Sequence, residues 1–95
     1  MKPTEVQTAV IKKYGKILQT FVAIEEMSEL MKELSKNMRG EKNHDALVEE
    51  VADVYIMLDQ IMTMYKLTDE EVTEMIHEKL KRTEERLKVK TNESV

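Results

Sequence analysis

Apolar residues recur every three or four positions along most of this 95-residue chain, which is the spacing of one face of a helix. The polar residues and glycines between these runs predict four helices. The first begins at a capping box formed by Thr4 and Gln7 and is interrupted near Gly15. The second covers about residues 16–38 and ends before Gly40, which can adopt the left-handed cap.

Two further helices are predicted after this loop. Asn43 or Asp45 caps the third helix. Thr68 and Glu71 form a capping box at the start of the fourth, which continues to about Lys88. The apolar stripes expected to face the core are Ile17, Phe21, Ile24, Met31 and Leu34 in the second helix, Leu47, Val51, Val54, Leu58, Ile61 and Tyr65 in the third, and Val72, Ile76, Leu80 and Leu87 in the fourth.

The composition supports an all-α fold. Two glycines and one proline provide too few turns for a sandwich or barrel of many short strands. Aromatic residues make up only 4% of the chain while methionine contributes 8 residues, so the core is expected to be aliphatic and adaptable. The length allows one domain, residues 1–95, in which we expect the polar tail 90–95 to fray.

The net charge and the absence of cysteine limit the partners and the cellular compartment that can be expected. A net charge of -4 argues against nucleic acid as a partner, because phosphate backbones are bound by basic surfaces. No apolar run approaches the roughly 20 residues that cross a bilayer, so no membrane association is expected. The chain has no cysteine and its N-terminal segment does not resemble a signal peptide, so we expect a cytoplasmic protein.

Two pairs of acidic residues suggest a metal site. Glu26 and Glu29 are three positions apart on the second helix, and Glu50 and Asp53 are three positions apart on the third. Residues at this spacing share a helical face, so the two pairs can converge if the helices are antiparallel neighbours. The alternative is a solvated acidic face, but Glu50 and Asp53 fall within an apolar stripe. A cluster of oxygen ligands without cysteine suits Mg²⁺ or Mn²⁺.

A row of cations lies on the fourth predicted helix. Lys79, Arg82 and Arg86 follow one another at helical spacing beside the apolar stripe. Alone, such a row is more typical of a solvated surface with internal ion pairs such as Glu78 to Arg82. Next to a carboxylate cluster it could instead bind the phosphates of a metal-bound substrate.

Together these motifs resemble the MazG-type, all-α nucleoside triphosphate pyrophosphohydrolases. The resemblance covers about residues 10–88 and rests on Glu25-Glu26-x-x-Glu29 and Glu50-x-x-Asp53, with Tyr14-Gly15 and Gln19 before the first motif. It implies a four-helix MazG-like bundle that hydrolyses a (d)NTP to the monophosphate and pyrophosphate. The Mg²⁺ ligands that it implies are Glu26, Glu29, Glu50 and Asp53.

The resemblance also suggests roles for residues around the metal. Glu25 is a candidate acceptor for the proton of the attacking water, or a ligand of a second ion. Lys79 and Arg82 match basic positions of the family, and Arg86 matches less closely. Tyr14 stands where the family commonly has Trp, and it either stacks on the base or packs between helices.

Two other interpretations remain open at this point. The second and third helices are apolar on more than one side, which predicts a homodimer or homotetramer and also allows a non-catalytic helical oligomeric adaptor with structural acids. A di-iron carboxylate bundle would use Glu-x-x-His pairs, and Glu41-x-x-His44 and Glu74-x-x-His77 have this spacing.

Overall fold

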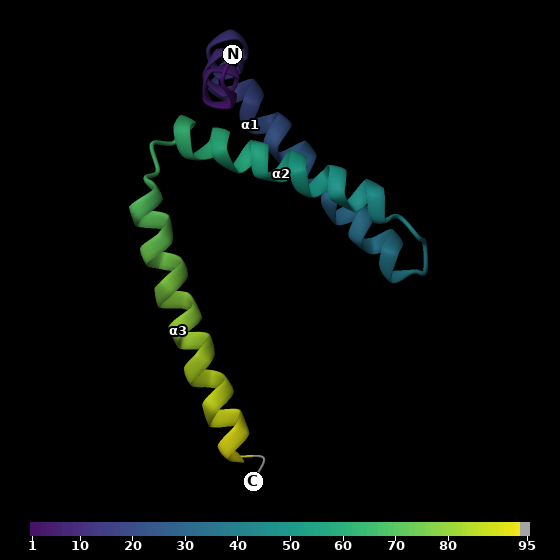
Figure 1. The fold of residues 1–95 in the computed structure, drawn as a ribbon, viewed down its shortest axis with the longest axis vertical. Coiled ribbons are helices and arrows are strands. Elements are labelled where there is room, and N and C mark those ends of the chain that lie inside the picture. The colour runs from purple at the N-terminus through teal and green to yellow at the C-terminus, as the bar shows by residue number, and fades with distance from the viewer. Residues whose placement is uncertain (94–95) are drawn as a thin grey trace.

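The computed structural model describes residues 1–93, and the side chains of residues 1–89. Over this range the chain forms three helices and no strand: α1 (Pro3–Met38), α2 (His44–Met64) and α3 (Asp69–Glu93) (Figure 1). The predicted all-α class is therefore confirmed. The first two of the four predicted helices are joined in the single element α1, which is kinked at Gly15, where the predicted break lies.

The start of α1 differs from the prediction. The helix begins at Pro3, whose fixed φ suits the first helical position, and Lys2 precedes it without a side-chain cap. The predicted capping box at Thr4 and Gln7 is wrong. The Gln7 amide instead donates to the carbonyl oxygen of Ile56 in α2, at 2.9 Å. A tertiary contact therefore uses the side chain that the local pattern assigned to a cap.

Gly15 bends α1. Its φ of 86° and ψ of 162° lie outside the helical region, in a conformation accessible essentially only to glycine. The bend allows Gln7 and Gln19 to contact the same side chain, Gln60 of α2. Twelve residues of straight helix would separate these two glutamines by about 18 Å, too far for one amide to reach both. The N-terminal turns of α1 consequently lie at an angle to the rest of the helix (Figure 1).

The loop between α1 and α2 follows the prediction at Gly40 but not at Asn43. Gly40 has a φ of 98°, and the amide of Glu41 donates to the carbonyl oxygen of Lys36 at 3.1 Å, as in a Schellman cap. Asn43 is the residue before α2, but its side chain makes no cap. It donates instead to the carbonyl oxygen of Glu33 at 2.8 Å and to the Glu33 carboxylate at 2.7 Å. These bonds fasten the turn of the α1–α2 hairpin.

The interface between α1 and α2 does not use the flank of α1 that its apolar pattern predicts. Its most buried residues are Ala23, Met57 and Met64, with Gln19 and Gln60. The apolar residues of α1 predicted to face the core are 49–78% exposed, so this prediction is wrong: Ile17, Phe21, Ile24, Met31 and Leu34. The small Ala23 lets the opposite flank approach α2 closely, and hydrogen bonds satisfy the two buried glutamines there.

The same correction applies in part to α2. Leu47, Val54 and Ile61 are partly buried as predicted, whereas Val51, Leu58 and Tyr65 are at least 40% exposed. The packed line of α2 instead runs through Met57, Gln60 and Met64. The hairpin is therefore packed along one line of each helix, with apolar residues remaining on its outer faces.

The third helix stands apart from the hairpin. Its predicted capping box is confirmed, since the Thr68 amide donates to the Glu71 carboxylate at 2.9 Å and the Glu71 amide donates to the Thr68 hydroxyl at 3.1 Å. In the described range, no part of α3 packs against α1 or α2, and the helix extends away from them (Figure 1). The predicted inward positions Ile76, Leu80 and Leu87 are consequently 49–61% exposed.

The end of α3 also differs from the expectation. The helix continues through Glu93 rather than ending near Lys88, so residues 90–93 of the tail expected to fray are helical. Ser94 and Val95 lie outside the described residues. None of the described helices combines the length and apolarity needed to span a bilayer.

The bend at Gly15 leads to a stability prediction. Gly15→Ala should lower the free energy of unfolding by about 1–3 kcal/mol, the cost of holding a Cβ-bearing residue in this conformation. Apart from the two adjacent residues and the backbone of the helix itself, no atom lies within 4 Å of the added methyl group, so backbone strain is the cause. Urea unfolding followed by circular dichroism measures the effect, with Lys12→Ala on the exposed surface of α1 as control. Equal stability of Gly15→Ala and the parent would contradict the bend.

Candidate metal centre

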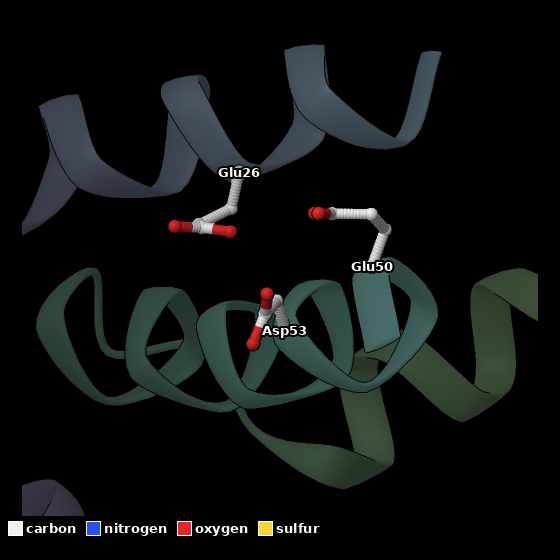
Figure 2. A group of neighbouring side chains, drawn as sticks. All are labelled: Glu26, Glu50 and Asp53. Atoms are coloured by element: carbon white, nitrogen blue, oxygen red, sulfur yellow. The ribbon is translucent and has the colours of Figure 1, made fainter. Parts of the chain in front are cut away.

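Three carboxylates meet between α1 and α2. Glu26 projects from α1, and Glu50 and Asp53 project from α2 into the space between the helices (Figure 2). One oxygen from each lies within 4.8 Å of the others. All three side chains are partly buried. This carboxylate cluster combines Glu26 with two acids that follow it by 24 and 27 positions in the sequence, so the hairpin rather than a local motif creates it.

The packing of the hairpin explains why these acids meet. Ala23 and Glu26 share the flank of α1 that faces α2, and Asp53 and Met57 share the corresponding flank of α2. Because the helices are antiparallel, packing Ala23 against α2 and Met57 against α1 also brings together Glu26 and Asp53, which lie next to them along each helix. The carboxylate cluster therefore extends the packed line of the hairpin.

The carboxylate cluster is electrostatically unfavourable when it is fully ionised. Burial raises the pKa of Glu50, and the nearby charges of Asp53 and Glu29 raise it further. Burial also raises the pKa of Glu26, with Asp53 and Glu50 adding to the effect. One oxygen of Glu50 is enclosed and accepts no hydrogen bond from any described residue. The group therefore favours a bound proton or a cation.

The donor set suits a hard divalent cation. Three carboxylates supply only oxygen ligands and a charge that a divalent ion can balance. Mg²⁺ and Mn²⁺ accept such ligands and keep further positions for water or phosphate oxygens. The enclosed oxygen of Glu50 is the observation in this structure that favours a cation, because a buried acceptor without a partner is costly.

The other acidic residues of the predicted site lie at the edge of this cluster. Glu29 is partly buried and close enough for its charge to raise the pKa of Glu50, but it is outside the three-carboxylate group. Glu25 is exposed, and its charge contributes to the raised pKa of Glu26. Tyr14 is 50% exposed, and the Nζ atom of Lys13 lies 5.3 Å from the centre of its ring.

The predicted phosphate-binding residues are not close to the carboxylates of their own chain. Lys79, Arg82 and Arg86 are exposed on α3, which does not pack against the hairpin. Arg82 forms an ion pair with Glu78 at 3.0 Å. His44 and His77, which a di-iron site would use, belong to no group of three potential metal ligands in the described part of the chain.

A row of three glutamines beside the carboxylate cluster was not predicted. The Gln19 amide donates to the Gln60 side-chain oxygen at 2.8 Å, and the Gln60 amide donates to the Gln7 side-chain oxygen at 2.7 Å. Gln19 and Gln60 are seven positions from Glu26 and Asp53 respectively, so each lies on the same helical flank as an acid. This shared spacing was the feature of the sequence from which the position of the glutamines beside the acids could have been predicted. The row links the bent start of α1 to α2 and holds the two flanks in register.

The charge of Glu50 leads to a second stability prediction. Glu50→Gln should raise the melting temperature in EDTA at pH 7, because glutamine keeps the shape of the side chain and removes the repulsion from Asp53 and Glu29. Glu49→Gln is the matched control, since Glu49 is adjacent and exposed and its charge raises the pKa of Glu50 less than the charges of Asp53 and Glu29 do, so this variant should raise the melting temperature less. A Glu50→Gln variant that melts below the parent would show that the carboxylate makes a stabilising contact.

The difference in melting temperature between Glu50→Gln and the parent should depend on pH. The pKa of Glu50 is raised above 4.5 in the folded chain, so the folded state binds this proton more readily than the unfolded state. Ionisation therefore costs stability above the raised pKa, and the cost disappears as pH falls through it toward 4.5. The melting-temperature advantage of Glu50→Gln should be largest at pH 7 and shrink on acidification. An advantage that grows on acidification would contradict the raised pKa.

No family model, curated protein or solved structure matches this chain. The likeness to the MazG-type enzymes therefore depends on the acidic motifs themselves. The geometry adds that Glu26, Glu50 and Asp53, drawn from both motifs, lie within reach of one ion.

Proposed function

We propose that this chain is a Mg²⁺-dependent nucleoside triphosphate pyrophosphohydrolase of the MazG type, for which Mn²⁺ can replace Mg²⁺. The reaction is the hydrolysis of a (d)NTP to the (d)NMP and pyrophosphate. The observation that supports it most strongly is the convergence of Glu26, Glu50 and Asp53 across the hairpin, with an enclosed Glu50 oxygen that lacks a hydrogen-bond partner. The resemblance of the two acidic motifs to this enzyme family supplies the reaction.

In this proposal the carboxylate cluster and Glu29 hold the ion. When bound, Mg²⁺ polarises the α-phosphorus and lowers the pKa of a coordinated water. Glu25 lies at the exposed edge of the cluster, where it can accept the proton of the attacking water or contact a second ion. The row of glutamines fixes the distance between α1 and α2, on which simultaneous ligation from both helices depends.

The remaining proposed roles concern the substrate. Lys79, Arg82 and Arg86 neutralise the charge that develops on the departing pyrophosphate. Tyr14 is half-exposed and offers a ring face for a nucleobase. The active form in this proposal is a homodimer or homotetramer that completes the four-helix bundle. The absence of cysteine fits a reducing compartment, and we place the activity in the cytoplasm.

A second candidate is a non-catalytic helical oligomeric adaptor. The observation in its favour is the large amount of apolar surface that α1 and α3 expose. In that case the carboxylates have a structural role only. The adaptor predicts neither a dependence on divalent ions nor turnover of nucleotides, so the same assay separates the two functions.

The proposed reaction predicts a specific product. A panel of NTPs and dNTPs with Mg²⁺ or Mn²⁺ should include at least one substrate that yields the monophosphate and pyrophosphate in equal amounts. EDTA and Glu50→Gln should abolish turnover, and Glu49→Gln should retain it, because Glu49 is exposed beside the carboxylate cluster. Ion chromatography separates pyrophosphate from orthophosphate. Release of orthophosphate in single steps would contradict cleavage between the α- and β-phosphates.

The basic residues of α3 should affect substrate rather than metal. Lys79→Ala and Arg82→Ala should each lower kcat/KM by about tenfold or more, the usual effect of losing a hydrogen bond to a charged group. The affinity for Mn²⁺ in the absence of nucleotide should not change. Lys81→Ala is the control, because Lys81 lies on the opposite side of α3 from the apolar stripe. Reduced Mn²⁺ affinity with unchanged kinetics would reverse these roles.

A further inference from the structure

The part of α1 before the bend is attached to the hairpin at few points. This N-terminal arm, residues 3–14, lies at an angle to the rest of α1 (Figure 1). None of its side chains is fully buried, and the partly buried ones are Gln7, Val10 and Ile11. Among the side chains that the structure describes, Gln7 is the one in the arm that hydrogen-bonds to α2. A segment with so few buried contacts opens locally at low cost, so the arm can leave α2 while the hairpin stays folded.

Gly15 is the joint at which such a movement can occur. Within α1 it has non-helical backbone angles, a φ of 86° and a ψ of 162°. Glycine populates several regions of φ and ψ at little cost because it has no Cβ. A change in these two angles moves the arm as a whole, while the helical segments on either side keep their shape. Gly15 is therefore suited to act as a hinge between the arm and the hairpin.

Gln7 attaches the arm to α2 close to the carboxylate cluster. Its amide donates to the carbonyl oxygen of Ile56 at 2.9 Å, and its side-chain oxygen accepts a hydrogen bond from Gln60 at 2.7 Å. Ile56 follows Asp53 by three residues and Gln60 follows it by seven, which are about one and two helical turns. The one polar attachment of the arm therefore lies within two turns of a proposed metal ligand, on the same helix.

Undocking of the arm would weaken the register of α1 and α2. Gln19 and Gln60 are 5% and 3% exposed while the arm is in place. Without Gln7, the Nε2 atom of Gln60 loses its acceptor, and a buried donor without a partner is costly unless water reaches it. Water that reaches Gln60 also competes for its bond with Gln19, which joins the two helices. The hairpin then loses a directional bond that fixes the distance between its flanks.

The carboxylate cluster acts on the same register from the other side of the glutamines. Oxygens of Glu26 and Asp53 lie within 4.8 Å of each other across the hairpin, so their charges push α1 and α2 apart when no cation is present. A divalent cation held by both acids would replace this repulsion by attraction. Gln19 and Gln60 lie two turns away on the same flanks, so a bound cation favours the helix spacing that their hydrogen bond requires.

We propose that the N-terminal arm is a latch coupled to the carboxylate cluster: a divalent cation held by Glu26, Glu50 and Asp53 strengthens the docking of the arm through Gln60, and docking strengthens cation binding by the same factor. The two effects are equal because both the cation and the arm favour one spacing of the hairpin, and such coupling is reciprocal. Tyr14 belongs to the arm, so the latch also determines where its ring lies. The latch rests on the cation site of the proposed function, but not on nucleotide hydrolysis.

Hydrogen–deuterium exchange with and without Mn²⁺ tests the latch in the unaltered protein. Saturating Mn²⁺ should slow the exchange of the backbone amides of residues 7–14 by about fivefold or more, the lower end of usual coupling factors. The amides of α3 are the internal reference, because this helix does not pack on the hairpin in the described range. In Glu50→Gln, which lacks one of the three carboxylates, Mn²⁺ should not slow the exchange of the arm. Unchanged exchange of the arm in a parent that binds Mn²⁺ saturably would overturn the latch.

Substitution of Gln7 tests the reciprocal effect. Gln7→Ala should weaken Mn²⁺ binding by about fivefold or more, although Gln7 is not one of the acids that hold the ion. Thr8→Ala is the matched control, since Thr8 is adjacent and exposed, and its hydroxyl donates to the carbonyl oxygen of Thr4 within the arm at 2.9 Å. Circular dichroism checks that both variants keep the helix content of the parent. A folded Gln7→Ala variant with the Mn²⁺ affinity of the parent would overturn the latch.

These measurements separate the latch from the proposed function. Slower exchange of the arm with Mn²⁺, in a protein that hydrolyses no nucleotide, would support the latch and reject the pyrophosphohydrolase. Nucleotide turnover and Mn²⁺ binding without any change in the exchange of the arm would reject the latch and leave the proposed function intact. A parent that binds no Mn²⁺ would overturn both.

Discussion

The packing of α1 against α2 along one line of residues is the constraint on which the rest of the structure depends. This line is unusual because polar groups occupy much of it: Gln19 and Gln60 are buried beside Ala23 and Met57. Buried amides are tolerated only when they are hydrogen-bonded, and such bonds are directional. The glutamine bonds therefore specify the register of the two helices as well as stabilising it. Gly15 contributes by bending α1 until Gln7 can complete the row.

The carboxylate cluster lies on the same line of residues, but the interactions among its side chains are unfavourable. The glutamines satisfy one another, whereas Glu26, Glu50 and Asp53 repel one another when ionised. Burial and mutual charge raise the pKa values of Glu26 and Glu50 for this reason. By contrast, Glu33 receives hydrogen bonds from Asn43, which hold its pKa below the usual range. The hairpin thus places a hydrogen-bonded acid at its turn and mutually repelling acids in its middle, where a bound proton or cation would relieve the repulsion.

Local chemistry was predictable from the sequence where neighbouring residues decide the structure. The capping box at Thr68 and the left-handed cap at Gly40 depend on a few adjacent residues, and both are present. The pairing of the two acidic motifs was predictable because a spacing of three places each pair on one helical face. Of the predicted ligands, Glu29 lies outside the three-carboxylate group, since the antiparallel crossing favours the acids nearest to the buried residues.

The choice of packing partner was not predictable. Periodicity identifies the apolar stripe that contains Ile17 and Phe21, but it does not tell whether α2 or another molecule covers that stripe. The prediction assigned the more apolar flank of α1 to its own core, and the glutamine bonds favour the other flank. Similarly, the stripe of α3 was correctly identified as apolar and wrongly placed against the hairpin. In a chain of 95 residues, much of the apolar pattern falls on residues that the packing of α1 against α2 leaves exposed.

The central claim is that the hairpin brings its acids together to hold a divalent cation. The most direct measurement is a titration with Mn²⁺ in which electron paramagnetic resonance reports the free ion. The parent should bind Mn²⁺ saturably at pH 7, Glu49→Gln should bind it equally, and Glu50→Gln should lose most of the affinity, because Glu50 lies in the carboxylate cluster and Glu49 is exposed. Equal binding by the parent and Glu50→Gln, or none by either, would contradict the claim.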